Sequence, residues 1–331
     1  MEQHEMSTMK HLVYGEFGEP DVLTVAETAV PEPGPEEVLV RVRAAGLNPI
    51  DWKTRRGLGF AALQIRDHLP WTPGYDLAGE VVAVGEKVAT LMPGDRVMGM
   101  VGFPSDGGAC ARYRTALAEE LVIVPDELDL VAAAALPLAG LTAWQALYDV
   151  GELDPGQKVL IHAGAGGVGH LAVQFALARG AHVLATASSD NRDFLAGLGV
   201  HEVIDYHAVN FEDECYGLDL VIDLVGGDTG KRSLKTLSEQ GIIVTVPTVT
   251  ADEIVSEAEQ LGLRAHGITV QPDVFQLEEI LELIEDGQVK VHVDGVFALD
   301  DAPAAHRLLE SGHVRGKLVL DLEIEPEPDA V

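Results

Sequence analysis

The chain has little of what a disulfide scaffold, a metal cluster or a membrane anchor requires. Its two cysteines, Cys110 and Cys215, are too few for a disulfide framework or a four-thiolate zinc site. No hydrophobic run approaches the ~20 residues that span a bilayer, and the segment from Met1 to Lys10 is polar. These absences argue against a disulfide-rich secreted protein and a membrane protein, and we expect a soluble protein of the cytoplasm.

Positive charge is also scarce. The 331 residues include 22 Lys and Arg against 54 Asp and Glu, a formal net charge of −32. Nucleic acid and anionic membranes both need a positive patch, so neither is expected as a partner. The acidic residues are spread along the chain and lysine is rare, which favours a halophilic protein whose carboxylate shell keeps it hydrated in high salt. A moderately acidic enzyme from an ordinary environment is the alternative.

The chain does have enough hydrophobic sequence for two cores, since 47% of its residues are hydrophobic and its length suits two domains. Between about Lys10 and Asp126, short apolar runs alternate with Gly and Pro turns, as at residues 38–43, 80–85 and 95–100. This pattern predicts a compact β-rich domain. The first ten residues and the acidic tail from Glu323 to Val331 are predicted to be disordered.

After Val124 the pattern changes to strands that alternate with helices, following an Ala-rich helical region at 130–150. The strands are expected at 158–163, 183–187, 202–205, 219–225, 242–246 and 265–270, and the helices at 170–179, 190–198, 229–237 and 252–261. This alternation predicts an α/β fold with a doubly wound parallel sheet. The last part contains a predicted helix at 277–286 and strand-like runs at 293–298 and 317–322.

A glycine-rich turn, residues 164–169 (GAGGVG), joins the first of these strands to its helix. Gly164 permits a tight turn, Gly166 lets the backbone approach a pyrophosphate, and Gly169 allows close packing of helix on strand. The free N–H groups that begin the helix then face the phosphates. The turn predicts a dinucleotide site, and a glycine turn without a ligand is the alternative.

The end of the second strand indicates which dinucleotide binds. Enzymes that use NAD usually place Asp or Glu there, on the ribose hydroxyl, whereas this strand ends at Ala187 and continues with Ser188. Ser188 and Arg192 favour the 2′-phosphate of NADPH, which an arginine can bind through two hydrogen bonds. Asp190 is expected to be a helix N-cap. An exposed helix residue is the alternative for Arg192.

Five short motifs together resemble the medium-chain dehydrogenase/reductase superfamily, in particular its zinc-free quinone oxidoreductase and enone reductase branch. They are residues 44–51 (AAGLNPID), 73–81 (PGYDLAGEV), 93–97 (PGDRV), 141–143 (LTA) and 163–169 (AGAGGVG). The resemblance runs from about Val13 to Leu322. It implies a GroES-like, β-rich catalytic domain made of residues 1–126 and 271–331, with a Rossmann dinucleotide-binding domain, residues 127–270, inserted between them.

The sequence departs from the zinc-dependent members of this superfamily at the catalytic metal. Those relatives carry Cys at the position of Asn48, and Gly-His-Glu where this chain has Gly74, Tyr75 and Asp76. Amide and phenol groups are poor zinc ligands, so we predict no metal site. Without a Lewis acid, alcohol oxidation is disfavoured. The expected activity is zinc-independent, NADPH-dependent transfer of hydride to a quinone or an α,β-unsaturated carbonyl.

The resemblance also implies roles for individual residues. Asn48 would contact the substrate or the nicotinamide ribose, Thr142 would lie at the nicotinamide, and Tyr75 would be the hydrogen-bond or proton donor unless it is a packed core aromatic. Asp51 would be a structural carboxylate. Cofactor contacts are implied for Gly166, Gly167 and Val168 at the pyrophosphate, in the turn that Gly164 and Gly169 shape, for Ser188 and Arg192 at the 2′-phosphate, and for Tyr206 near the adenosine. Val225, Gly226 and Pro247 follow strand ends, where a doubly wound sheet places its ligand crevice, and Lys317 would return to the cofactor.

Some implications and alternatives stay open at this point. A surface lysine is the alternative for Lys317. The family's homodimer would form through the strand at 265–270, an otherwise unpaired edge. The enzyme could instead reduce another activated double bond, such as that of an enoyl thioester, although an acidic surface disfavours polyanionic coenzyme A. A nicotinamide-binding protein without turnover is a further alternative, because a fold does not establish an activity.

Overall fold

The computed structural model describes residues 8–324 of the chain. Residues 1–7 and 325–331, which hold most of the two segments expected to be disordered, lie outside the described residues. The prediction is wrong for the rest of the first segment, because strand β1 (Thr8–Val13) begins at Thr8 and pairs with β2 (Thr24–Ala29). At the other end, Glu323 and Ile324 are exposed and follow the last strand.

Contacts between residues divide the chain into two compact units. The first unit comprises the residues up to 138 together with 272–281 and those from 293 on, and the second unit comprises Ala139–Gln271 and Glu282–His292. The first unit continues to residue 138, beyond the boundary expected at residue 126. The reason is that helix α3 (Leu130–Ala134) packs on β3 (Glu37–Leu47) and β4 (Asp76–Val84) of that unit.

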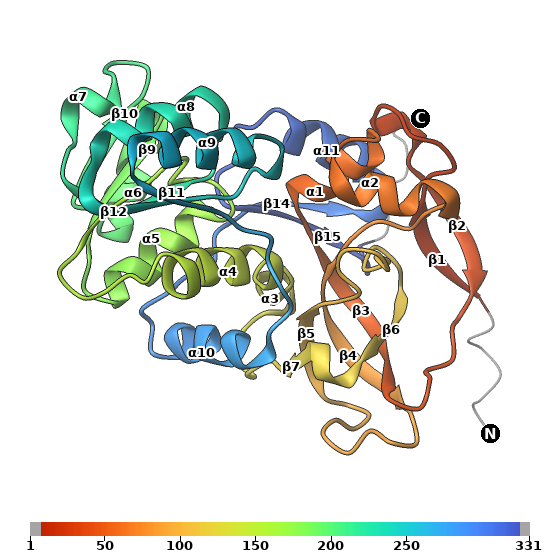
Figure 1. Ribbon diagram of the computed structural model, residues 1–331. Coiled ribbons are helices and arrows are strands. Elements are labelled where there is room, and N and C mark those ends of the chain that lie inside the picture. The colour runs from red at the N-terminus through yellow and green to blue at the C-terminus, as the bar shows by residue number, and fades with distance from the viewer. Residues whose placement is uncertain (1–7, 325–331) are drawn as a thin grey trace. The chain divides into compact units, whose positions relative to one another are not determined.

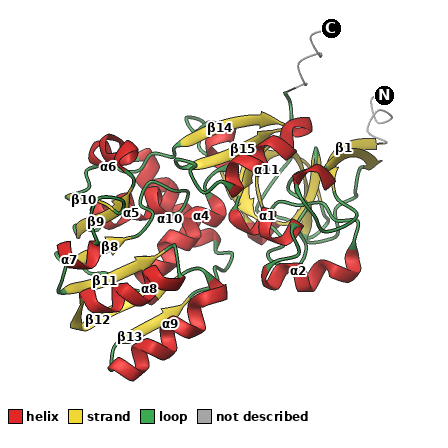
Figure 2. Cartoon of the chain, turned by 90° about the horizontal axis from the view of Figure 1, so that it is seen from above, coloured by secondary structure: helices red, strands yellow, loops and turns green. Residues whose placement is uncertain are grey.

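The second unit is built on a parallel sheet of six strands (Figure 2). In spatial order these are β10 (Glu202–Asp205), β9 (His182–Ala187), β8 (Lys158–Ile161), β11 (Leu218–Asp223), β12 (Leu237–Thr245) and β13 (Arg264–Gly267). Every neighbouring pair is parallel, which confirms the doubly wound sheet expected from the sequence. The order reverses between β8 and β11, and the crevice for a ligand in such a sheet lies at the carboxyl ends beside that reversal.

Helices cover both faces of this sheet (Figure 1). They are α5 (Gly169–Ala178), α6 (Arg192–Leu198), the short α7 (Phe211–Glu214), α8 (Gly227–Ser233) and α9 (Thr248–Leu261). Helix α5 contacts β8 and β9, and α9 contacts β12 and β13. The helical region expected at 130–150 is divided, because Pro137 begins a separate helix, α4 (Pro137–Trp144), which continues into a π-helical turn (Gln145–Val150).

The first unit contains a seven-stranded, mostly antiparallel sheet. Its strands are β14 (Val293–Ala298), β15 (Lys317–Asp321), β3, β4, β5 (Arg96–Met100) and β7 (Leu121–Ile123) in spatial order, with β6 (Tyr113–Leu117) paired to β3. Strand β15, from the end of the chain, pairs with β3, which in turn pairs with β4. This register puts Leu318 opposite Leu47 and Gly46 opposite Asp76, so three distant segments meet at one end of the sheet.

The expectation that the chain forms only strands and turns before Asp126 is wrong. The first unit also contains α1 (Pro49–Arg55), α2 (Gly59–Ile65) and, near the end of the chain, α11 (Ala302–Glu310). Helix α1 begins at Pro49, directly after the N-cap residue Asn48, a position where the missing N–H of proline costs nothing. α10 (Val274–Glu285) is present as predicted.

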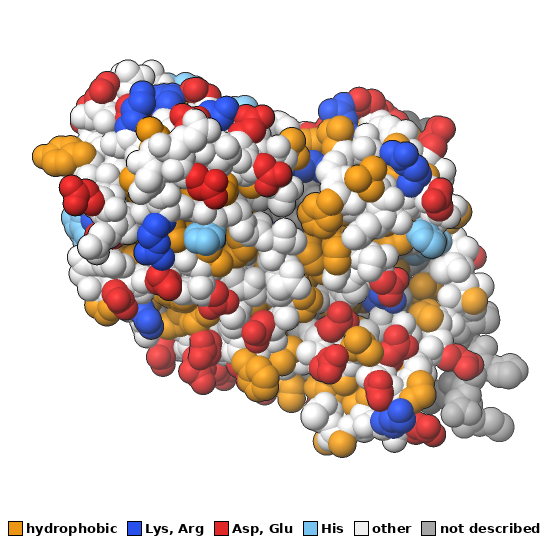
Figure 3. All heavy atoms as spheres, viewed as in Figure 1, with side chains coloured by type: hydrophobic (Ala, Val, Ile, Leu, Met, Phe, Trp, Pro, Cys, Tyr) orange, Lys and Arg blue, Asp and Glu red, His pale blue; other side chains and the backbone are white. Residues whose placement is uncertain are grey.

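Acidic side chains are spread over the face of the molecule drawn in Figure 3, where Lys and Arg are fewer. This is the surface that the charge of −32 implies. Among the described residues, no helix is long and apolar enough to cross a membrane.

Candidate functional site

The turn between β8 and α5 leaves no room for side chains at two of its glycines. The N–H of Gly164 donates to Thr186 O at 3.0 Å, and a Cβ on Gly164 would lie 2.7 Å from the Cβ of Ala185. A Cβ on Gly169 would lie 2.2 Å from Ala163 O. Both glycines are therefore required for the close approach of the turn to the neighbouring strand and of the helix to the turn.

The same turn presents unpaired backbone donors at the start of a ten-residue helix. The N–H groups of Gly167 and Val168 have no hydrogen-bond partner among the described residues, and neither residue is fully buried. The carbonyl of Gly166 accepts from the backbone N–H of His170 at 3.0 Å and lies 2.9 Å from its Nδ1. Unpaired N–H groups at a helix N-terminus suit an anion, and this cradle fits a pyrophosphate.

The next strand end across the reversal of strand order is shaped by a buried carboxylate. Asp223, the last residue of β11, accepts hydrogen bonds from the N–H groups of Val225 (3.0 Å) and Gly226 (2.8 Å), and from the Thr245 hydroxyl (2.9 Å). Gly226 has a φ of +78°, and a Cβ there would lie 2.4 Å from Thr250 Oγ1. Val225 is 52% exposed at this edge, so its side chain is open to solvent.

The residues expected at the adenosine end lie at or just after the ends of β9 and β10. Ser188 is half-buried and its hydroxyl accepts from Asn191 Nδ2 at 3.1 Å. Arg192 is exposed and forms no ion pair with any described residue. Tyr206 is 48% exposed, after β10. Asp190 is not the N-cap expected of it, because it lies in a 3-10 turn and the N-cap position of α6 is occupied by Asn191.

The first unit holds a buried polar cluster around Asn48. The Asn48 amide donates from Nδ2 to Asp76 Oδ2 at 2.8 Å, and its Oδ1 accepts from Lys317 Nζ at 2.5 Å. Lys317 also donates to Leu47 O at 2.8 Å, and Asp76 Oδ1 accepts from the N–H of Leu138 at 2.8 Å. Both ends of the amide are thereby fixed, and one hydrogen on Nδ2 stays without an acceptor among the described residues.

Lys317 and Asp76 form a buried pair of opposite charge. Lys317 is 3% exposed and Asp76 is fully buried, with Nζ and Oδ2 3.7 Å apart. Burial lowers the pKa of Lys317 and raises the pKa of Asp76, and the attraction between the two charges opposes both shifts. The alternative of a surface lysine is therefore wrong, and a cofactor contact for Lys317 stays a prediction.

Asp51 lies beside this cluster as the third residue of α1. Its Oδ2 accepts from the backbone N–H of Asn48 at 2.7 Å, which makes it a structural carboxylate, whereas its Oδ1 is buried and accepts no hydrogen bond of regular geometry from the described residues. The backbone N–H of Gly74 lies close enough to lower the pKa of the carboxyl. Burial raises the pKa of Asp51 to about 7. A carboxyl group with this pKa can hold a proton near neutral pH.

Tyr75 is 2% exposed and its hydroxyl donates to Pro104 O at 3.0 Å. Its ring lies against the ring of Phe103, with centroids 5.2 Å apart, and Phe103 in turn contacts Phe60. Burial, followed by the charge of Asp51, raises the pKa of Tyr75. The hydroxyl hydrogen is thus committed to a backbone carbonyl, and the role of Tyr75 as a donor to substrate stays a prediction.

The remaining expected residues are placed as follows. Thr142 is 4% exposed in α4, and Pro247 is the N-cap residue of α9, after β12. Sequence reasoning missed Phe103 and Asp223, whose contacts depend on chain folding and carry no motif. No group of three or more His, Cys, Asp or Glu within residues 8–324 could hold a metal ion.

Comparisons with known proteins agree with this arrangement. Residues 34–126 match the alcohol dehydrogenase GroES-like domain, and residues 198–320 match a family described as zinc-binding dehydrogenase. The chain is 36% identical to a 2-methylene-furan-3-one reductase of Solanum lycopersicum and 35% identical to an NADPH-dependent alkenal/one oxidoreductase of Arabidopsis thaliana, over 95% and 94% of this chain and 79% of each relative. The solved structure of a quinone oxidoreductase from Coxiella burnetii superimposes with a TM-score of 0.93, at 43% identity over 96% of this chain and all of that one.

Proposed function

The chain belongs to the quinone oxidoreductase branch of the medium-chain dehydrogenase/reductase superfamily, and we therefore propose that it reduces a quinone or an α,β-unsaturated carbonyl with NADPH and without a metal. Oxidoreductase activity is what its relatives share. The observation that carries the proposal is the glycine turn at residues 164–169. Its glycines leave room for a ligand to approach the backbone closely, and the unpaired N–H groups of Gly167 and Val168 suit a pyrophosphate.

NADPH rather than NADH is supported by charge. The strand that would carry an acidic residue for the ribose of NADH ends at Ala187, and Arg192 is exposed with no carboxylate paired to it among the described residues. A free guanidinium near Ser188 suits a 2′-phosphate. The relative named as NADPH-dependent agrees with this choice.

The Asn48 cluster supplies what hydride transfer to such an acceptor requires. The cofactor would supply a hydride to the electrophilic carbon of the acceptor, and the acceptor oxygen would take up a proton. The developing negative charge on that oxygen needs a hydrogen-bond donor, and the free Nδ2 hydrogen of Asn48 is one. Lys317 and Asp76 hold the amide in the orientation in which it can only donate.

Consumption of NADPH by the purified protein tests this function. We expect turnover with benzoquinone and with methyl vinyl ketone, unchanged after exhaustive treatment with a chelator. Crotonyl-coenzyme A, included to represent an enoyl thioester, is expected to be a poor substrate because the surface is acidic. Turnover of crotonyl-coenzyme A alone would assign the other reductase activity, and binding of NADPH without turnover of any acceptor would indicate a silent binding protein.

We also propose a homodimer that forms through β13. This strand is an edge of the six-stranded sheet, and Arg264, His266 and Gly267 on it are exposed. An open strand edge can pair with a second copy of itself. Light scattering after gel filtration should give twice the chain mass of 35.3 kDa. Ala265→Pro should give monomers, because N–H groups alternate along the strand and that of Ile268 donates to Thr245 O of β12, which leaves the N–H of Ala265 on the open edge. A monomer of the unchanged protein at all concentrations would contradict the proposal.

A further inference from the structure

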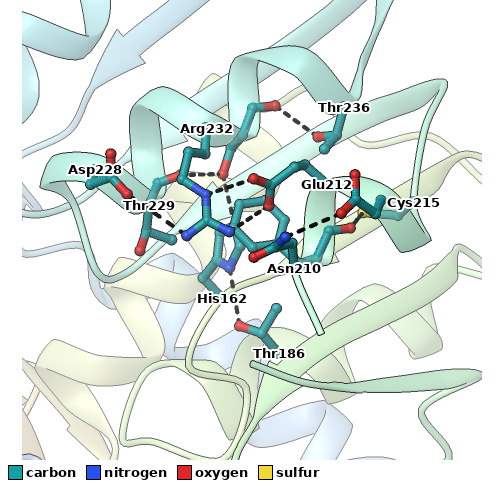
Figure 4. A network of polar contacts seen from close by, with 12 residues as sticks. His162, Thr186, Asn210, Glu212, Cys215, Asp228, Thr229, Arg232 and Thr236 are labelled. Carbon is teal, nitrogen blue, oxygen red and sulfur yellow. Dashed lines mark hydrogen bonds and ion pairs between the residues drawn. The ribbon is translucent and has the colours of Figure 1, made fainter. Parts of the chain in front are cut away.

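A buried histidine, His162, lies two residues before the glycine turn at residues 164–169, and both of its ring nitrogens have partners (Figure 4). His162, the residue after β8, is 1% exposed. Its Nδ1 lies 3.0 Å from Thr186 Oγ1 and its Nε2 lies 2.8 Å from Ser233 Oγ. It therefore joins β9, which carries Thr186, to α8, which carries Ser233.

These contacts form a series of hydrogen bonds from Thr229 through Ser233, His162 and Thr186 to Ala163. The groups at its two ends determine which atom donates in each bond. The Ser233 hydroxyl donates to Thr229 O at 2.7 Å, so it must accept from His162, whose Nε2 carries the proton. Nδ1 of the neutral ring is then an acceptor and takes the hydroxyl hydrogen of Thr186. Thr186 Oγ1 accepts in turn from the N–H of Ala163 at 3.2 Å. One protonation state of His162 satisfies every group.

The last of these groups, the N–H that donates to Thr186, belongs to Ala163, the residue directly before the glycine turn. Ala163 has a φ of +50°, a left-handed conformation that is uncommon for a residue with a Cβ. Its carbonyl accepts from the N–H of Gly166 at 3.0 Å and is the atom that a Cβ on Gly169 would strike. The conformation of Ala163 thus sets where the carbonyl points, and the carbonyl shapes the turn.

Water is kept away from the chain of contacts. Thr186 is 3% exposed and Ser233 is fully buried. The ring of Phe211 meets the His162 ring edge to face at 4.6 Å, and the Arg232 guanidinium lies over the Phe211 ring while it pairs with Glu212 (Figure 4). Burial lowers the pKa of His162 to about 4, so the ring is neutral in the tautomer that the contacts require. Hydrogen bonds in such an environment are strong and specify one arrangement.

We propose that His162 is a positioning residue for the dinucleotide. Through the Thr186 hydroxyl it holds Ala163 in the left-handed conformation, and Ala163 holds the turn at residues 164–169 in the shape that receives a pyrophosphate. The inference rests on the proposed function only in that the turn binds a dinucleotide. It does not depend on which acceptor is reduced or on the choice between NADPH and NADH.

Two substitutions at His162 itself separate positioning from packing. His162→Phe keeps the ring and loses both hydrogen bonds, whereas His162→Asn loses the bond to Ser233 but can keep an acceptor near Thr186. We expect calorimetric titration with NADP⁺, and separately with NAD⁺, to show a dissociation constant raised at least ~10-fold by Phe and within ~3-fold of the unchanged protein for Asn; tenfold corresponds to ~1.4 kcal/mol. Equal effects of the two substitutions would overturn the proposal.

A second pair of variants breaks the chain of contacts on either side of the histidine. Thr186→Val removes the hydroxyl that holds Ala163, and Ser233→Ala removes the hydroxyl on the far side. Both should lower Tm, but only Thr186→Val should weaken nucleotide binding, and Thr186→Ser should restore it. If binding follows Tm in both variants, His162 is only structural. If the unchanged protein binds neither nucleotide, the proposed function falls with the inference, whereas binding without turnover removes the function alone.

Discussion

The two units each bury a histidine completely, and the two histidines differ in every contact. His162 in the second unit has a partner at both ring nitrogens, whereas neither nitrogen of His306 in the first unit has one among the described residues. The contrast extends beyond these two. Every buried side-chain atom of residues 8–324 that lacks a hydrogen-bond partner belongs to the first unit: Tyr14, Asp51, Thr54, Arg55, Arg114 and His306.

A buried polar atom without a partner costs free energy, so such atoms in a native fold call for an explanation. Asp51 lies next to Asn48, which we propose as the donor to the substrate oxygen, and burial raises the pKa of Asp51, so that a larger fraction of this carboxyl is protonated near neutral pH. We propose the second unit as the site of the cofactor and the first as the site of chemistry. Among the described residues, the second unit has no buried side-chain polar atom without a partner, whereas the first unit has one on Asp51, beside Asn48.

The largest effect should come from the buried ion pair of the first unit. Lys317→Met leaves Asp76 as an uncompensated buried charge, and we expect the free energy of unfolding to fall by about 3–5 kcal/mol. The matched control is Lys317→Met with Asp76→Asn, which removes both charges and keeps an acceptor for Leu138. Urea unfolding measures both. A double variant no more stable than the single variant would show that the two charges do not act as a pair.

The second effect concerns the donor itself. Asn48→Ala removes the free N–H proposed to face the acceptor oxygen, and we expect kcat to fall by about 10²–10³. The dissociation constant for NADP⁺ should change by less than ~3-fold, a change of under ~1.4 kcal/mol, because the glycine turn at residues 164–169 belongs to the other unit. Steady-state kinetics and calorimetry measure the two quantities. A loss of nucleotide binding with kcat preserved would place Asn48 at the cofactor instead.

The pH dependence of stability separates the units further. Burial lowers the pKa of His162 to about 4 and of His306 to about 3, so each contributes stability that is present above pH 6.5 and lost as the pH falls toward these values. The pKa of Asp51, raised to about 7, gives the opposite slope, because its contribution is complete below its unfolded pKa of 3.8 and is lost as the pH rises to 7. Asp51 and His306 therefore offset each other within the first unit.

Removing that offset is the test. Asp51→Asn should steepen the loss of stability on acidification from about pH 6.5 to 4 by up to ~1.4 kcal/mol per pH unit, the value for one proton. Urea midpoints measured at several pH values for the variant and the unchanged protein give the slopes. Identical slopes would mean that Asp51 is ionised throughout this range.

Replacing the buried histidines His306 and His162 should change the free energy of unfolding by a smaller amount, and in opposite directions in the two units. His306→Leu removes two unpaired buried nitrogens and should stabilise the protein by ~1 kcal/mol, whereas His162→Leu should destabilise it because Thr186 and Ser233 lose their partner. Thermal unfolding of the two variants measures both changes. Destabilisation by both would remove the contrast between the units.

The smallest effect is expected at Tyr75. Its hydroxyl hydrogen is held by Pro104 O, so Tyr75→Phe should leave turnover at saturating NADPH nearly unchanged. Steady-state turnover with a quinone is the measurement. A fall of tenfold or more would instead support the donor role that the family resemblance implies.

The sequence was sufficient for the parts of the molecule that local pattern specifies. It predicted the strands at 202–205 and 293–298 with their observed bounds, and the parallel order of the second unit. It missed α1, although Asn48, Pro49 and Asp51 are the residues that start a helix, because the Gly and Pro content of the region favoured turns.

The contacts that make the candidate site could not be predicted in this way. Lys317 reaches Asn48 only because β15 pairs with β3, across 269 positions of the chain. His162 looks like a lone core histidine in the sequence, since its partners lie 24 and 71 positions away. Local patterns carry no information on such pairs, which depend on how distant strands and helices meet.

Metal-free, NADPH-dependent reduction is tested most directly by steady-state kinetics with one quinone, measured with NADPH and with NADH after exhaustive chelation of metals. We predict that kcat/KM is at least ~10-fold higher for NADPH, since one bound phosphate contact to Arg192 corresponds to ~1.4 kcal/mol or more. Arg192→Gln should remove most of this preference and leave NADH turnover unchanged. A preference for NADH, or the loss of activity on chelation, would show that the protein is not a metal-free, NADPH-dependent reductase.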